Sequence, residues 1–202
     1  MTAVSIIYFS GSGHTTKLAE AVRKGAASVD GVNVNLIAIS GDDITKGRFA
    51  NDALLAQLDA SEAIIFGSPT YMGGPAAQFK AFADATGERW FKSAWRDKLS
   101  AGFTVSSSPS GDKFSTLQYF HTFAMQHGMI WIGLGEMPMQ SNGVNRLGGY
   151  SGATAQAGFD SPEVAPSVED KLTGEVLGQR VAAFAAKLKK SSRQTNSNSS
   201  KQ

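Results

Sequence analysis

The chain alternates between short apolar runs and segments with apolar residues at helical spacing. The apolar runs have the length of buried strands and lie at residues 4–9, 32–39, 63–67, 99–105 and 129–134. The helical segments end near residues 28, 58, 86, 126 and 188. Residues 40–50, 87–98 and 135–165 fit neither pattern, so we expect loops there. Alternation of strands and helices predicts an α/β fold with a parallel, doubly wound sheet and helices on both faces.

The five predicted strands suit the strand order 2-1-3-4-5. In such a sheet, ligands bind beyond the carboxyl ends of the strands, beside the first strand, where the order reverses. Three loops leave those ends, at residues 10–16, 68–75 and 106–111, and all are rich in small hydrogen-bonding residues. We therefore predict one binding site formed by these three loops.

The first loop, residues 10–16, joins the first strand directly to a helix and reads Ser-Gly-Ser-Gly-His-Thr-Thr. The first N–H groups of a helix have no intrahelical acceptor and lie at the positive end of the helix dipole, so they attract anions. Glycine lets the backbone approach a phosphate, and hydroxyl groups donate hydrogen bonds to it. The loop indicates a phosphate site. The alternative is an ordinary strand–turn–helix connection, because Ser and Thr are also common helix caps.

The spacing of the glycines limits which phosphate-containing ligands the loop could bind. The loop lacks the G-x-x-x-x-G-K-[ST] pattern of nucleoside triphosphatases, and Thr16 stands where G-x-G-x-x-G requires its third glycine. A loop with many hydroxyls and little positive charge suits a phosphate monoester that is held mostly by neutral donors.

Composition excludes other kinds of site. The 202 residues, of which 42% are hydrophobic and 18% charged, suit one globular domain at residues 1–188. With no cysteine, the chain cannot form disulfides, use a catalytic thiol or bind zinc through Cys, and its three histidines are not spaced as metal ligands, so no metal is expected. No apolar run has membrane-spanning length and no leader precedes the first strand, so we expect a cytoplasmic protein without a membrane span.

The formal net charge of +2 comes from the end of the chain. Residues 187–202 carry five Lys and Arg and no acid, so the rest of the chain is close to neutral. We therefore expect no specific nucleic-acid binding. Residues 189–202, rich in Ser, Asn and Gln, are expected to form a disordered basic tail.

Five short motifs, in order and at suitable intervals, resemble the flavodoxin superfamily and, within it, the NAD(P)H:quinone oxidoreductases of the WrbA type. The similarity extends to about Leu188. The motifs are Ser10-Gly11-Ser12-Gly13-His14-Thr15, Gly67-Ser68-Pro69-Thr70-Tyr71-Met72-Gly73, Thr86-Gly87-Glu88-Arg89-Trp90, Gln126-His127-Gly128-Met129 and Gly148-Gly149-Tyr150-Ser151-Gly152-Ala153-Thr154.

The resemblance implies an FMN cofactor, NADH or NADPH as electron donor, a quinone or similar flat acceptor, and a homodimer or homotetramer. The residues it assigns to FMN are Ser10, Gly11, Ser12, Gly13, His14 and Thr15 at the phosphate, Pro69, Thr70, Tyr71, Met72 and Gly73 along the ring, and Ser106, Ser107, Ser108, Ser110 and Gly111 beside its pyrimidine edge. It also implies catalytic positions for Trp90, at the mouth of the ring pocket and often from a neighbouring subunit, and for His127, from a helix end.

Alternatives remain for the histidines and for the function. His14 either acts as a base or serves the phosphate through its backbone, and His127 either contacts the ligand or is only a favourable residue at a helix C-terminus. An enzyme that transfers two electrons by a ping-pong mechanism competes with a flavodoxin-type one-electron carrier. Carriers of that kind usually present a strongly acidic face, whereas residues 87–98 hold four cations against two acids. This balance favours the enzyme.

Overall fold

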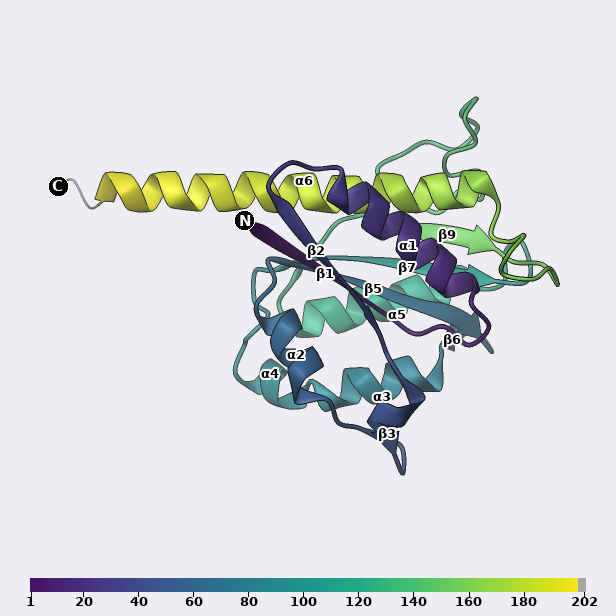
Figure 1. The fold of residues 1–202 in the computed structure, drawn as a ribbon, viewed down its shortest axis with the longest axis horizontal. Coiled ribbons are helices and arrows are strands. Elements are labelled where there is room, and N and C mark those ends of the chain that lie inside the picture. Colours follow the sequence, from purple (N-terminus) through teal and green to yellow (C-terminus); the bar gives the residue numbers. More distant parts are fainter. Residues whose placement is uncertain (200–202) are drawn as a thin grey trace.

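A twisted parallel sheet separates two layers of helices (Figure 1). The computed structural model describes the backbone of residues 1–199 and the side chains of residues 1–191. The helices are α1 (His14–Ala27), η1 (Gly41–Asp43), α2 (Asp52–Asp59), α3 (Ala77–Ala85), α4 (Gly87–Phe91), α5 (Lys113–Gln126) and α6 (Val168–Ser199). The strands are β1 (Thr2–Tyr8), β2 (Val32–Ala38), β3 (Ile44–Thr45), β4 (Arg48–Phe49), β5 (Ala63–Tyr71), β6 (Gly74–Pro75), β7 (Leu99–Ser106), β8 (Ile130–Trp131) and β9 (Ala153–Gln156).

The main sheet runs in the order β2-β1-β5-β7-β8, and neighbouring strands on this path are parallel. This confirms the α/β class and the parallel sheet. The prediction of a five-stranded sheet in the order 2-1-3-4-5 was too simple, because the described sheet has seven strands. Two short strands lie off the main path: β6 pairs antiparallel with β5, and β9 pairs parallel with β7.

The sheet position beside β7, predicted for a fifth strand at residues 129–134, is shared by two short strands, β8 and β9. Only Ile130–Trp131 pairs with the start of β7, whereas Ala153–Gln156 pairs with its end. The chain leaves β7 in between because Leu134 donates its backbone N–H to the carbonyl of Tyr150 instead. The expectation of a continuous loop at 135–165 was therefore wrong. The missed strand β9 consists of small residues without an apolar run.

Two other expected loops contain regular structure. Residues 40–50 include the β3–β4 hairpin, and residues 87–98 begin with helix α4. The segment after α4 is anchored by Trp95, whose fully buried indole donates to Asp59 Oδ1 at 2.7 Å.

The final helix α6 continues past its predicted end at Leu188 to Ser199, and its C-terminal part projects beyond the sheet (Figure 1). Disorder of the tail at 189–202 stays a prediction, and residues 200–202 lie outside the described residues.

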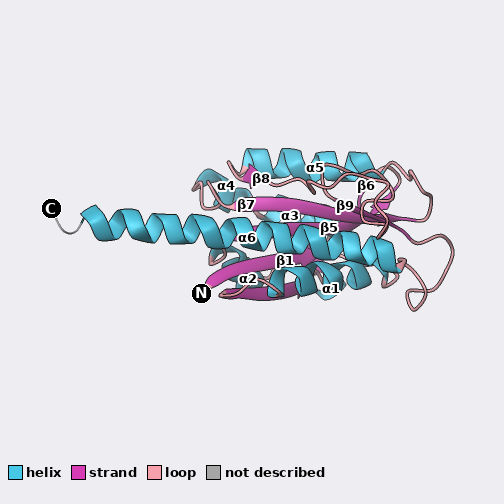
Figure 2. Cartoon of the chain, turned by 90° about the horizontal axis from the view of Figure 1, so that it is seen from above, coloured by secondary structure: helices cyan, strands magenta, loops and turns pink. Residues whose placement is uncertain are grey.

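Each face of the sheet has its own apolar core. Figure 2 shows helices on both sides of the sheet. Alternate residues of β1 point to the two sides: Ile6 packs in the core beneath α1 and α6, and Ile7 packs in the core that includes residues of α2, α3 and α5. The second core is rich in aromatic rings, such as those of Phe66, Phe79 and Phe120. Burial on both faces explains why the central strands are continuous apolar runs.

Helices α1 and α6 approach each other closely through glycine. A Cβ atom on Gly25 would lie 1.8 Å from the carbonyl oxygen of Glu175, and one on Gly178 would lie 1.9 Å from that of Val22. These obstacles are backbone atoms, so a side chain at either position would force the two helices apart.

We expect Gly25→Ala to lower the free energy of unfolding by about 2–3 kcal/mol, since overpacking outweighs the better helix propensity of Ala. Urea denaturation measures this change. Gly87→Ala is the control, because a Cβ there meets nothing within 4 Å. Equal denaturation midpoints for the two variants would show that α1 and α6 can separate at little cost.

Candidate functional site

The first predicted loop forms a turn at the positive end of α1. Ser10 Oγ accepts hydrogen bonds from the backbone N–H groups of Gly13 at 3.1 Å and Thr16 at 3.3 Å. Accepting two donors directs the hydroxyl proton of Ser10 away from the backbone. The N-cap residue of α1 is Gly13, which has no side chain, and no acidic residue lies in the first turn of the helix. The loop therefore offers donors and partial positive charge to an anion.

Glycine is required at two positions of this loop. A Cβ atom on Gly11 would lie 2.4 Å from the hydroxyl oxygen of Tyr71, so the first loop packs directly against the second. Gly13 has a φ of +94°, in the left-handed region that disfavours other residues. A Cβ atom on Gly13 would also lie 3.0 Å from the side chain of Pro162. The two glycines thus let the first loop pack closely against its neighbours and keep the turn, the anion cradle, that presents the N–H groups of the helix to a phosphate.

The second predicted loop is a hairpin tip at the end of β5. Met72 and Gly73 have positive φ angles between the paired ends of β5 and β6, and the side chain of Met72 is fully exposed. The hydroxyl of Thr70 is used inside the protein, because Thr70 Oγ1 lies 2.8 Å from both Thr104 Oγ1 and Thr116 Oγ1. Tyr71 is half-exposed and Met72 is exposed, so these two side chains are available to a flat ligand.

The third predicted loop folds tightly over the end of β7. Gly111 has a φ of +52°, and a Cβ there would lie 2.0 Å from Ser106 Oγ. Ser106 is buried and donates its hydroxyl to the carbonyl of Ser108 at 2.9 Å, whereas Ser107, Ser108 and Ser110 are exposed.

The third loop is held from below by Lys113, a residue that the sequence analysis missed. Its Nζ donates to Ser106 Oγ at 2.8 Å and to the carbonyls of Ser108 at 3.0 Å and Pro109 at 2.8 Å. Burial lowers the pKa of the Lys113 amine to about 8, so it remains protonated at neutral pH. Hydropathy gives no sign that a lysine at the start of a helix is buried.

A fourth segment, residues 157–163 after β9, also reaches the cradle. His14 Nε2 lies 2.9 Å from the carbonyl oxygen of Asp160, and His14 Nδ1 lies 3.0 Å from Ser12 Oγ. Glu163 is 3.5 Å from Lys17 Nζ, on the first turns of α1. The His14 ring therefore links two loops, which favours the interpretation that its backbone serves the phosphate. The sequence analysis missed this segment because it follows an unpredicted strand.

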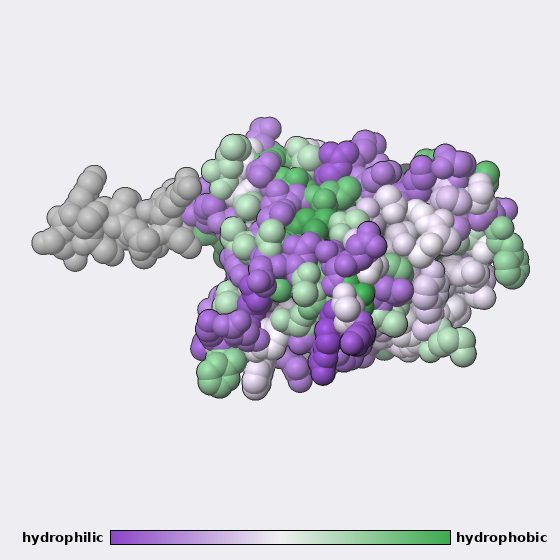
Figure 3. Space-filling view, turned by 60° about the horizontal axis from the view of Figure 1, so that its bottom comes forward, coloured by the Kyte–Doolittle hydropathy of each residue, from purple (hydrophilic) through white to green (hydrophobic). Residues whose placement is uncertain are grey.

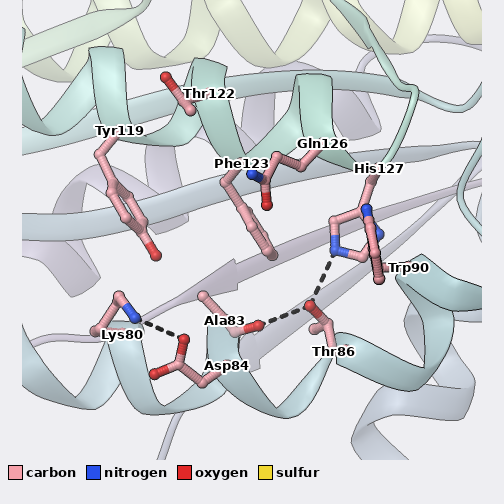
Figure 4. A pocket seen from close by; sticks show the side chains of 11 residues that line it. Lys80, Ala83, Asp84, Thr86, Trp90, Tyr119, Thr122, Phe123, Gln126 and His127 are labelled. Carbon is pink, nitrogen blue, oxygen red and sulfur yellow. Dashed lines mark hydrogen bonds and ion pairs between the residues drawn. The ribbon is translucent and has the colours of Figure 1, made fainter.

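Trp90 and His127 lie together at the other end of the fold. They line a cavity of about 410 Å³ between α3, α4 and α5 (Figure 4). His127 is buried, and its ring centroid is 4.5 Å from that of Trp95. Thr86 Oγ1 donates to the carbonyl of Ala83 at 2.7 Å, so His127 Nε2 at 2.9 Å must be the donor to Thr86. His127 Nδ1 then carries a lone pair and has no hydrogen-bond partner among the described residues.

The structure thus brings the three loops together and places Trp90 and His127 apart from them. The third loop leads into the start of α5, whereas His127 follows its end, and a helix of 14 residues is about 20 Å long. Within one chain, Trp90 and His127 are therefore too far from the first loop to share its ligand. A catalytic role for them stays a prediction that requires a second copy of the chain.

The face that carries α3 and α4 is mostly polar, with apolar side chains in separate spots (Figure 3). Trp90 and Phe91 are exposed on α4. No group of His, Asp and Glu among residues 1–199 is arranged to hold a metal ion. No helix in the same range is both long and apolar enough to cross a bilayer.

Burial lowers the pKa of His127 to about 4, from an ordinary value of 6.5. Between these two values the unfolded chain binds a proton that the folded chain does not. The free energy of unfolding is therefore unaffected by the titration of His127 above pH 6.5. It decreases as the pH falls from 6.5 toward 4, by up to about 3 kcal/mol.

We expect urea denaturation between pH 7 and pH 4.5 to show a steeper loss of stability in the wild type than in His127→Gln, which keeps an N–H donor for Thr86 without a titrating ring. Parallel pH profiles of the two proteins would show that His127 titrates normally.

Three comparisons relate this site to known proteins. The model of the family described as NADPH-dependent FMN reductase matches residues 4–142. Flavodoxin FldP of Pseudomonas aeruginosa is 38% identical over 193 residues, which cover 93% of this chain and 99% of that protein. The NAD(P)H dehydrogenase (quinone) of Geobacter sulfurreducens is 34% identical, over 92% of this chain and 98% of that enzyme.

The solved structures agree with the sequence relatives. The flavodoxin, WrbA-like protein from Agrobacterium tumefaciens is 41% identical, with a TM-score of 0.73 over 93% of this chain and 99% of that one. Flavodoxin 2 from Bacillus cereus, at 19% identity and a TM-score of 0.57, shares the fold. These findings confirm a flavodoxin-like fold and, at the level of the family, the predicted use of FMN and NAD(P)H. The cradle at β1, the two loops beside it and the sequence relatives lead to one assignment: the chain belongs to the NADPH-dependent FMN reductase family.

Proposed function

We propose that this protein is a cytoplasmic FMN-dependent enzyme that transfers two electrons from NADH or NADPH to a quinone or similar flat acceptor. The observation that carries the proposal is the anion cradle where β1 meets α1: a glycine-containing turn at the positive end of the helix, in which Ser10 Oγ accepts from the N–H groups of Gly13 and Thr16 and its own proton stays available to a phosphate. Relatives that are named NAD(P)H dehydrogenase (quinone) support the choice of acceptor.

The residues of the three loops fit FMN in separate roles. Ser10, Ser12, Thr15 and the backbone of Gly11–His14 would hold the phosphate, the segment Pro69–Gly73 would border the ring, and the third loop would lie at its pyrimidine edge. FMN, when bound, accepts hydride from the donor and passes electrons to the acceptor. The protein would hold and orient it, and the exposed side chains of Tyr71 and Met72 would shield the ring from water.

A single exposed ring face would receive both substrates in turn, because a nicotinamide and a quinone are both flat and need the same space. This is the basis for proposing a ping-pong mechanism. Trp90 and His127 would complete the site only from a second copy of the chain, in a homodimer or homotetramer. The exposure of Trp90 and Phe91 supports contact with another copy.

A one-electron carrier is the alternative, and one observation favours it. The relative named Flavodoxin FldP, at 38% identity, is more similar to this chain than the three named quinone dehydrogenases, at 30% to 34%. A carrier would bind FMN at the same loops but would oxidise NAD(P)H negligibly.

We expect the purified protein to bind FMN with quenching of flavin fluorescence, and Ser10→Ala to weaken binding by about 1.5–3 kcal/mol, the value of a hydrogen bond to a charged group. Ser28→Ala is the matched control, since its hydroxyl donates to Gly25 at the opposite end of α1. A wild type that does not bind FMN would refute the proposed function. Unchanged affinity in Ser10→Ala would place the phosphate elsewhere.

We expect parallel double-reciprocal lines when NADPH is varied at several concentrations of benzoquinone. Trp90→Ala should reduce quinone turnover about three- to tenfold, the effect of losing one aromatic contact, and leave the affinity for FMN unchanged. Trp90→Phe keeps an aromatic ring and should retain most of the turnover. Intersecting lines would contradict the proposal that both substrates use one ring face in turn. Negligible oxidation of NADH and NADPH would favour the one-electron carrier.

A further inference from the structure

A cation lies buried beneath the third loop. Lys113, the first residue of α5, is only 4% exposed. Its three hydrogen bonds, to Ser106 Oγ and the carbonyls of Ser108 and Pro109, saturate the donors of an ammonium group. All three acceptors are neutral, so they solvate the charge without cancelling it. Burying an ammonium group costs free energy. A neutral donor such as an amide could hold the same oxygens at a lower cost, so the loop alone does not require a charged residue here.

The ionised groups near Lys113 leave its charge uncompensated. Asp170 is buried and attracts Lys113, but its carboxylate makes two hydrogen bonds to the Arg146 guanidinium, at 2.7 Å and 2.8 Å. The backbone N–H of Gln156 on β9 donates to the same carboxylate at 2.8 Å. Asp112 precedes Lys113 but is exposed to solvent, where its charge is screened. Among the described Lys, Arg, Asp and Glu residues, Lys113 and Asp170 are the buried ones, and the Asp170 carboxylate is already bound by Arg146 and Gln156. The Lys113 ammonium therefore has no ion-pair partner of its own at this edge of the sheet.

The strand order places this charge beside the proposed ring site. β1, β5 and β7 are consecutive neighbours, and Pro69 in the second loop pairs with Val105, which precedes Ser106. Neighbouring strands lie about 4.8 Å apart, so a ligand with its phosphate on the first loop and a flat ring along the second reaches the third.

Reduction changes the charge of such a ligand. Hydride transfer from NAD(P)H adds two electrons and one proton to FMN and leaves NAD(P)⁺, so FMN gains one negative charge. A positive charge near the ring is one of the means by which a protein tunes a flavin.

We propose that Lys113 is a positioning residue that tunes the cofactor: it fixes the third loop through three hydrogen bonds, and its charge makes the site bind reduced FMN more tightly than a neutral side chain would. The inference rests on the proposed function, because it requires FMN at the three loops. It assigns the tighter binding of reduced FMN to a residue outside the ligand contacts.

The test compares midpoint potentials of FMN-loaded variants, measured anaerobically by spectroelectrochemistry, together with the dissociation constant of oxidised FMN. Lys113→Met keeps the length of the side chain without charge, and Lys113→Gln keeps an amide donor for the carbonyls if the Met variant does not fold. Lys113→Arg keeps the charge. Lys98→Met is the matched control. Lys98 is half-buried and also donates to a backbone carbonyl, that of Asp59, but it directly precedes β7 and so lies at the end of that strand opposite to the third loop.

We expect the neutral variants to bind reduced FMN, relative to oxidised FMN, about tenfold more weakly than the wild type, the effect of one charge at about 10 Å in a protein environment. For a two-electron couple this equals a potential about 30 mV more negative. Lys113→Arg and Lys98→Met should stay close to the wild-type potential.

Two outcomes would overturn the inference. An unchanged potential with weaker binding of oxidised FMN would mean that Lys113 only shapes the loop. An equal shift in Lys98→Met would mean that any lost cation has this effect. Failure of the wild type to bind FMN refutes the proposed function instead, and this is established before any variant is measured.

Discussion

Parallel pairing of β1, β5 and β7 is the constraint on which the rest of this structure depends. These strands are buried on both faces, so every backbone polar group must be paired within the sheet, and every connection must return over a helix to the same starting edge. All three carboxyl ends consequently meet at one edge. Strand pairing thus makes neighbours of loops that are far apart in sequence, and contacts such as that of Gly11 with Tyr71 form between loops that the sheet has already brought together.

Within that edge, polar groups divide into those that support the loops and those that face outward. Thr70 and Ser106 use their hydroxyls internally, and the buried amine of Lys113 spends its donors on the third loop. Ser10 instead accepts from two amides and leaves its proton for a ligand. The outward groups of the first loop are neutral and the nearest buried charge lies below the third, so the phosphate and the ring of a flavin would meet different electrostatic surroundings.

The sequence predicted those parts of the fold that hydrophobic periodicity encodes. β1, β5 and β7 correspond to continuous apolar runs, the pattern of strands that are buried on both faces. The loops that join these strands to the following helices are rich in Gly and Ser. β9 was missed because Ala153 and Ala155 fill a narrow space with small side chains, which no apolar run reveals. Lys113 was missed because burial of its stem and amine is a tertiary effect. Motif matching predicted catalytic positions for Trp90 and His127, but a matching motif does not show which end of the sheet a residue occupies.

The last position of the sheet is shared by two short strands, β8 and β9. As a result, the segments around the site follow strands of different length. The first and second loops follow strands of seven and nine residues, whereas the segment that reaches over His14 follows a strand of only four. That segment is tied to the third loop by two backbone hydrogen bonds, from Ala157 to Ser106 and from Gly158 to Ser107. Short pairing with few bonds belongs to the low end of local opening free energies. The cover of the cradle is therefore held mainly by side-chain contacts to α1, from His14 and Lys17, whereas the loops beneath it are held by the sheet.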